Sequence, residues 1–213
     1  KVCMENIPKA FLKYVRVINE ENLIPEKYRK LIKKSFGDRY GWALQQFLKV
    51  EQILRSSTEI NFLLDADTFL IQSRCWIDKE GRQALFPSWE FNSQYYSLLS
   101  GFGLSTISPD FTFVTHHMLI KKDLLLESLE FIKVYSVTDL IEKVISNTEE
   151  SHSPFCVEYE LYGQYLYNHK KDMFFMTKWS NINVSRTDIL GKSKSEIEKE
   201  YAKYGSISVH SYL

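Results

Sequence analysis

The chain has 213 residues, of which 44% are hydrophobic and 25% charged, a balance typical of one globular domain and not of a disordered tail. Its 27 Lys and Arg residues equal its 27 Asp and Glu residues, so the net charge of zero predicts no nucleic-acid partner. No stretch reaches the roughly 20 apolar residues that span a bilayer, which leaves only peripheral membrane association open.

The first clear period in the sequence begins at residue 40. Ala43, Phe47 and Val50 recur at helical spacing and predict an amphipathic helix over residues 40–55, with Gln45 and Lys49 on another face. A solvated polar face is the simpler interpretation of those two side chains. Upstream we expect, in chain order, a strand at 1–4, a helical piece at 9–13, a strand at 14–18 and a helix at 23–36.

The apolar run from Ile60 to Leu64 predicts a strand that is buried on both faces. It stops at Asp65, and a helix followed by such a strand indicates an α/β fold, in which ligands gather at the carboxyl ends of strands. Further along we expect strands at 68–71, 75–77, 83–86, 111–115, 172–178 and 206–212, and helices at 91–99, 121–132, 137–146, 157–167 and 192–204. The segments 75–77 and 83–86 are expected to pair across a turn at 78–81.

Asp65 and Asp67 are the sharpest chemical feature of the sequence. Two carboxylates at i and i+2, where a strand meets a loop, can reach one divalent ion directly or through water. A Mg²⁺ or Mn²⁺ ion there would offset the charge that develops on a departing diphosphate. An acidic loop that caps a helix is the structural alternative, and the apolar run before the triplet favours the metal site.

Glu158 and Glu160 lie at the start of an expected helix. The helix dipole stabilises carboxylates at such a position, which is a sufficient structural explanation. The functional alternative is that one of them takes the proton from an acceptor hydroxyl, with Glu158 as first choice and Glu160 in reserve.

Basic side chains complete the candidates. His116 and His117 are adjacent on an expected strand, so at most one of them faces a cleft. His210, in the last expected strand, can bind a transition metal, and Lys49 can meet a phosphate as a point charge. Structural or solvated roles explain each of these residues as well.

The cysteines and several absent motifs narrow the class of protein. Cys3, Cys75 and Cys156 are far apart and lack the paired spacing of a zinc site, so we interpret them as reduced, buried thiols of a cytoplasmic protein. The sequence has no Gly-rich phosphate loop, no Gly-x-Ser-x-Gly elbow and no His-Glu-x-x-His helix.

Four separated motifs occur in order, namely Gly41 to Lys49, Leu63 to Thr68, Val114 to Leu119 and Glu158 to Gly163. With the closing segment Ser208 to Tyr212, this order resembles a bacterial family of GT-A-like glycosyltransferases of cell-surface polysaccharide synthesis. The resemblance extends from about Val15 to the C-terminus.

The resemblance implies a single GT-A-like (Rossmann-like) α/β domain over residues 1–213, a mixed sheet flanked by helices. Its first strand and loop, which recognise the nucleotide base in that fold, are expected either upstream of Lys1 or only as the segment Lys1 to Met4. It implies that Asp65, Asp67 and His210 hold Mn²⁺ or Mg²⁺, and that Glu158 or Glu160 is the acceptor-side base. It also implies a set of substrate-binding residues in the cleft: Gln45, Gln46, Lys49, Asp65, His116 and His117.

The implied reaction moves a sugar from a UDP- or GDP-linked donor to a hydroxyl of a surface glycan or lipid-linked saccharide, with inversion, in the cytoplasm or at the inner face of the membrane. Two alternatives stay open. A nucleotidyltransferase would use the same carboxylates on a metal, and a non-catalytic glycan- or nucleotide-binding module would keep the fold without turnover.

Overall fold

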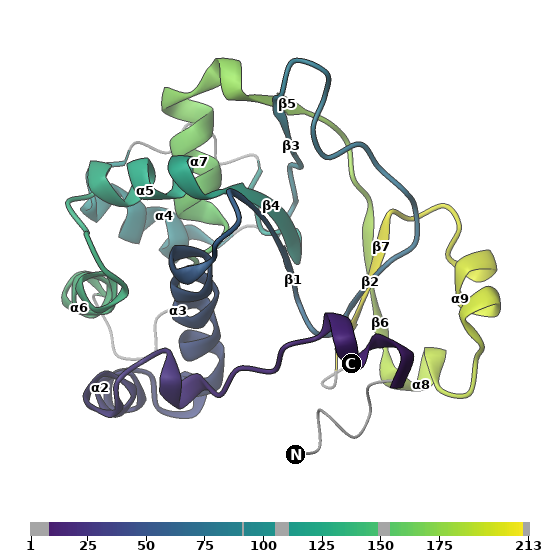
Figure 1. The fold of residues 1–213 in the computed structure, drawn as a ribbon, viewed down its shortest axis with the longest axis horizontal. Helices are drawn as coiled ribbons and strands as arrows, with labels where there is room; N and C mark the ends of the chain where they lie inside the picture. Colours follow the sequence, from purple (N-terminus) through teal and green to yellow (C-terminus); the bar gives the residue numbers. More distant parts are fainter. Residues whose placement is uncertain (1–8, 91, 105–110, 149–153, 211–213) are drawn as a thin grey trace.

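A computed structural model describes residues 9–90, 92–104, 111–148 and 154–210, without the side chains of residues 11, 12 and 210. It has a helical side and a strand side (Figure 1). Helices α2 to α7 gather on the first, whereas three short sheets and the small helices α8 and α9 form the second. The predicted mixed α/β class is therefore confirmed.

On the helical side, the other helices lie around α3, and most of the hydrophobic core lies among them. Its helices are α2 (Glu26–Phe36), α3 (Tyr40–Arg55), α4 (Ser93–Gly101), α5 (Lys122–Phe131), α6 (Val137–Asn147) and α7 (Glu160–His169). The described residues also form α8 (Arg186–Ile189), α9 (Lys194–Glu200) and the 3₁₀ turns η1 (Lys9–Tyr14), η2 (Glu20–Asn22), η3 (Gly37–Arg39) and η4 (Lys171–Met173). Among the described residues, no helix is both long and apolar enough to cross a membrane.

The strands form three small sheets. In the first, β1 (Ile60–Leu64) pairs antiparallel with β4 (His117–Lys121), and Leu64 lies opposite His117. In the second, β7 (Ser206–His210) lies between β2 (Thr68–Leu70), to which it is antiparallel, and β6 (Asn181–Ser185), to which it is parallel. In the third, β3 (Gln83–Leu85) pairs parallel with β5 (Phe174–Met176).

Several local predictions are confirmed by these elements. Helix α3 has the predicted bounds, and α2 begins just after Pro25 and ends before Gly37. The predicted pairing across residues 78–81 is present, since Ile77 forms a bridge with Gln83.

The predicted burial of β1 on both faces is wrong. Ile60, Phe62 and Leu64 are 49%, 40% and 44% exposed, and the residues between them are half-buried. Leu63, on the alternate face of β1, packs against the core, so only one face of the strand is covered and the side chains of the other reach solvent. An apolar run alone does not reveal which faces of a strand other elements cover.

Other predicted strands also differ from the structure. Residues 15–18 form no strand, and of the segment 111–115 only Thr112 pairs, with Ser88, while the strand itself begins at His117. Strand β6 and helix α8 have no counterpart among the predicted elements. The strand expected at 1–4 lies outside the described residues, as do the last two residues of the one expected at 206–212.

A close approach between α7 and the 111–114 segment fixes the region around the candidate site. A Cβ added at Gly163 would lie 2.5 Å from the ring of Phe113, so only glycine lets the helix backbone reach this ring. The backbone N–H of Phe113 donates to the carboxylate of Glu160 in the first turn of α7. Both contacts tie the segment that precedes β4 to the start of α7.

Candidate functional site

The site is built around Asp65, the first residue after β1. The Asp65 amide donates to the carbonyl of His116 over 2.9 Å, which extends the β1–β4 ladder by one step and brings the two side chains together. His116 has a φ of 62°, in the left-handed region that only a few non-glycine residues occupy. This backbone turn separates the orientation of His116 from that of the strand that follows.

The Asp65 carboxylate receives groups from three other segments. Its Oδ1 lies 2.5 Å from Lys49 Nζ on α3 and accepts a hydrogen bond of 2.8 Å from the Tyr159 hydroxyl just before α7. Its Oδ2 lies 3.2 Å from His116 Nδ1. The side chain is only 18% exposed, so these interactions are only partly screened by solvent.

The charges of this cluster shift the pKa of its members in opposite directions. Burial alone would raise the pKa of Asp65, but the hydrogen bond with His116 and the charge of Lys49 outweigh it and lower the pKa to about 2. Burial would lower the pKa of His116, yet its hydrogen bonds with Asp65 and Glu90 raise it to about 9. At neutral pH Asp65 is therefore an anion and His116 a cation.

Glu158 lies on the turn before α7 and shares Lys49 with Asp65. Its Oε1 is 3.3 Å from Lys49 Nζ, and its side chain is 5% exposed. Burial raises the pKa of Glu158 although the Lys49 charge opposes the shift. A carboxylate with a raised pKa takes up a proton more readily than an ordinary one, which suits a general base.

Gln46, on α3, fixes the backbone that leads to Glu158. Its side-chain amide donates to the carbonyl of Phe155 over 2.9 Å and accepts from the N–H of Val157 over 3.0 Å. The side chain is only 1% exposed. Gln46 therefore acts on the site through the position of Glu158.

These residues line a cavity of about 460 Å³, which we call the Asp65 cleft. Of the residues that the sequence singled out, the structure brings together six in its lining, namely Gln45, Gln46, Asp65, Asp67, His116 and Glu158. Lys49 joins them through its ion pairs with Asp65 and Glu158.

The predicted metal ligands lie near one another along the backbone. The carbonyl of Asp67 accepts a 2.8 Å hydrogen bond from the N–H of Val209, and Thr68 pairs with Ser208, so the backbone of His210 runs beside the Asp65–Asp67 turn. Among the side chains that the structure describes, which exclude His210, no three His, Cys, Asp or Glu residues form a metal-binding group. Carboxylate and imidazole ligands at Asp67 and His210 would suit Mn²⁺, with Asp65 reaching the ion through water because its oxygens already accept several hydrogen bonds.

Two predicted residues lie away from the cleft lining. Glu160 is fully buried, where it accepts hydrogen bonds from Phe113 N–H and Gln164, and burial raises its pKa to about 7. His117 is also fully buried, among the rings of Trp76, Phe86 and Trp179, and neither of its ring nitrogens has a hydrogen-bond partner in the described structure. This placement corrects the expectation, drawn from the resemblance, that His117 lines the cleft, and it does not place Glu160, the reserve choice for the acceptor-side base, in the lining.

The cysteine prediction is only partly right. Cys156 is buried and lines the Asp65 cleft, and burial raises the pKa of its thiol. Cys75 is exposed, because it lies on the irregular segment before the 78–81 turn. Both are free thiols, and Cys3 lies outside the described residues.

Sequence reasoning missed three residues of the cleft. Tyr159 lies between the two glutamates that were chosen, yet it is the one that touches Asp65. Glu90 contacts Nε2 of His116 at 3.3 Å, and Tyr95 lines the cleft from α4. The segments of Glu90 and Tyr95 carry no motif or charge pattern that marks them, and within the Glu158 to Gly163 motif the charged neighbours of Tyr159 drew the attention, so only the folded arrangement identifies these residues.

The comparisons with known proteins add no relative to this picture. No protein-family model matches the chain, and no curated protein matches it.

Proposed function

We propose that the Asp65 cleft is the donor site of a metal-dependent glycosyltransferase, which moves a sugar from a UDP- or GDP-linked donor to a hydroxyl of a glycan or lipid-linked saccharide in the cytoplasm. One observation carries the proposal. The acidic triplet and Glu158, 91 residues after Asp67 in the sequence, meet in a single cavity, as a leaving-group site and an acceptor base must.

A GT-A-like arrangement is part of the proposal. The observations that support it are the position of the triplet at the end of β1 and the return of the C-terminal strand β7 to pair with β2, directly after the triplet. With this pairing, the imidazole of His210 would serve as a metal ligand and complete a metal site together with Asp67.

In the proposed reaction, Asp67 and His210 would hold a divalent cation, whose charge would offset that of a departing nucleoside diphosphate. Lys49 offers a further cation to the same phosphates. The acceptor oxygen forms a bond to the anomeric carbon while the bond from that carbon to the diphosphate oxygen breaks, and the acceptor proton moves to a Glu158 oxygen. Attack opposite the leaving group inverts the anomeric centre.

Binding of the donor is the first test. A thermal-shift panel of UDP- and GDP-sugars, each with and without Mn²⁺, should give one nucleotide that stabilises the protein only when the metal is present. At a concentration of about 100 times Kd, the expected gain of about 2.7 kcal/mol raises Tm by about 5–10 °C for a chain of this size.

Matched variants then separate binding from chemistry. Asp67→Asn should abolish the metal-dependent shift, whereas Asp172→Asn, on the exposed η4 turn, should leave it unchanged. Glu158→Gln should keep the shift and lower transfer to a neutral saccharide acceptor by about 10²-fold or more. Metal-dependent donor binding that survives Asp67→Asn would remove the proposal.

A non-catalytic binding module is the second candidate, because Asp65 is already neutralised by Lys49 and His116. Such a module would bind a nucleotide or a glycan without metal dependence and without turnover. A metal-independent thermal shift together with no transfer would therefore favour this candidate over the enzyme.

A further inference from the structure

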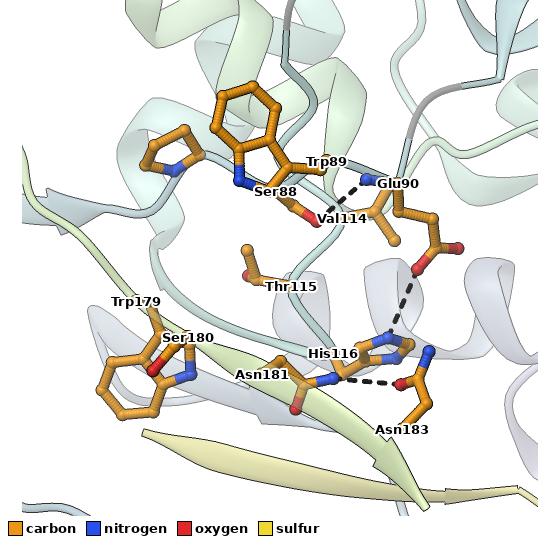
Figure 2. Close-up of a pocket in the computed structure, with 11 residues that line it drawn as sticks. Ser88, Trp89, Glu90, Val114, Thr115, His116, Trp179, Ser180, Asn181 and Asn183 are labelled. Carbon is orange, nitrogen blue, oxygen red and sulfur yellow. Dashed lines mark hydrogen bonds and ion pairs between the residues drawn. The ribbon is translucent and has the colours of Figure 1, made fainter. Parts of the chain in front are cut away.

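A second cavity, of about 540 Å³, is also lined by His116. We call this space the tryptophan cavity, and Figure 2 shows the residues that line it. Glu90, Val114 and His116 line both this cavity and the Asp65 cleft, so the two spaces adjoin.

The lining of the tryptophan cavity is aromatic and polar, with little free charge. It carries the indoles of Trp89 and Trp179, the amides of Asn181 and Asn183, and the hydroxyls of Ser88, Thr115 and Ser180. Its charged side chains, Glu90 and His116, lie 3.3 Å apart and partly neutralise each other. A neutral ligand with hydroxyl groups fits this chemistry better than a phosphate does.

Trp179 is held in position before any ligand arrives. Its indole N–H donates to Ser206 Oγ over 2.8 Å, and its ring packs against Phe86 and His117 at centroid distances of 5.1 and 4.6 Å. A Cβ at residue 205 would lie 2.6 Å from the ring, so Gly205 is what allows the strand backbone to support it. A fixed aromatic surface loses little entropy on binding.

The two asparagines present hydrogen-bond donors beside this ring. They stand at i and i+2 on β6 and therefore share a face, as Figure 2 shows. Asn181 Oδ1 accepts from Ser206 Oγ at 2.7 Å, and Asn181 Nδ2 donates to Asn183 Oδ1 at 3.1 Å. Both amide oxygens are thus engaged, which orients the NH₂ group of Asn183 as a donor to the cavity.

We propose that the tryptophan cavity binds the neutral saccharide that accepts the transferred sugar, an assignment that rests on the proposed function. A pyranose ring has an apolar C–H face that packs on an indole and hydroxyls that pair with amides and serines. Trp89, which is 85% exposed, gives such a ring a second indole at the rim. The adjoining Asp65 cleft would then receive the acceptor hydroxyl.

The test uses the donor-free protein and a panel of neutral methyl glycosides in the gluco, galacto, manno and N-acetyl forms, titrated with tryptophan fluorescence and saturation-transfer NMR. At least one glycoside should bind with a Kd in the millimolar range. Trp179→Ala should weaken this binding about tenfold or more, as truncation of a buried aromatic anchor does. Absence of binding by every glycoside would overturn the proposal.

Two further variants guard against misfolding of Trp179→Ala. Trp179→Phe keeps an aromatic ring and should retain most of the affinity. Asn183→Ala changes an exposed strand residue and should weaken binding several-fold, because it removes one donor. Tyr135→Ala is the control, because Tyr135 is an exposed aromatic residue between α5 and α6, away from the cavity lining, and its removal should leave glycoside binding unchanged. Unchanged glycoside binding in Asn183→Ala, with loss only in an unfolded Trp179→Ala, would refute the assignment.

The same variants distinguish this inference from the proposed function. If Trp179→Ala weakens UDP or GDP binding in Mn²⁺ and leaves the glycosides unaffected, the cavity holds the nucleotide base and the inference fails while the donor proposal stands. If the glycosides bind through Trp179 but no nucleotide binds, the saccharide assignment stands and the transferase proposal fails.

Discussion

Replacing Gln46 tests how the site is held together. This side chain makes two buried hydrogen bonds to the backbone of Phe155 and Val157, which lie three residues and one residue before Glu158. Gln46→Ala leaves one carbonyl and one N–H without a partner, and each such loss costs about 1–3 kcal/mol. We therefore expect the free energy of unfolding to fall by about 2–6 kcal/mol, toward the lower value if water from the cleft reaches the freed groups.

Gln46→Glu adds a pH dependence to the same experiment. The glutamate still accepts from Val157 N–H, but it can donate to the Phe155 carbonyl only when it is protonated. Its pKa in the folded state should thus exceed that in the unfolded state, so its stability should be greatest at acid pH and fall as pH rises above about 4.3.

Urea unfolding followed by circular dichroism, at pH 7 and at about pH 4.5, measures both effects. Gln45→Ala is the matched control, because Gln45 precedes Gln46 on α3 but is exposed, and we expect a change within about 0.5 kcal/mol. A Gln46→Ala protein as stable as the control would refute the argument that these two bonds fix the Glu158 segment.

The remaining predictions concern the two buried residues that lie outside the cleft lining. Burial raises the pKa of Glu160 from the ordinary value of 4.5 to about 7 in the folded protein. The free energy of unfolding therefore falls as pH rises from 4.5 to 7, by about 3 kcal/mol at the upper end, because the unfolded chain loses this proton first. Glu160→Gln should therefore gain stability relative to the native chain over this range in urea unfolding, and a constant difference would contradict the burial argument. His117 has a pKa of about 4 against 6.5, so protonation of the unfolded chain lowers stability as pH falls below 6.5, again by about 3 kcal/mol in full. His117→Phe should remove this acid sensitivity and raise Tm at pH 5, whereas a lower Tm at every pH would indicate an unrecognised partner of the imidazole.

Local features of the fold could be predicted where they follow from the side-chain pattern within a single element or from a short turn. The bounds of α3 follow from its helical period, and the 78–81 turn brings neighbouring segments together over a short loop. Sheet assembly could not be predicted in this way. The strand order β2–β7–β6 joins segments more than 100 residues apart, and no pattern within a strand encodes which partner it meets.

The candidate site was predicted by residue type but not by contact. Charged residues at Lys49, Asp65 and Glu158 were identifiable because carboxylates and cations stand out beside apolar runs. Their mutual distances depend on how α3, β1 and the turn before α7 pack, which composition and spacing leave undetermined. Tyr159 was overlooked for the same reason, since an aromatic residue next to two glutamates is more often a core residue.

The adjacent histidines show how a local rule and a long-range one combine. Alternation along an extended chain predicts that His116 and His117 point to opposite sides, and in the structure one lines the cleft while the other is enclosed by aromatic rings, although His116 precedes β4 and its positive φ adds a turn that strand alternation does not describe. Which of the two faces Asp65 depends on the β1–β4 register, because Leu64 opposite His117 leaves Asp65 to pair with His116. A slip of one residue would exchange their environments and with them the direction of each pKa shift, because contact with Asp65 and Glu90 raises the pKa of whichever imidazole lies there and burial among the rings lowers that of the other.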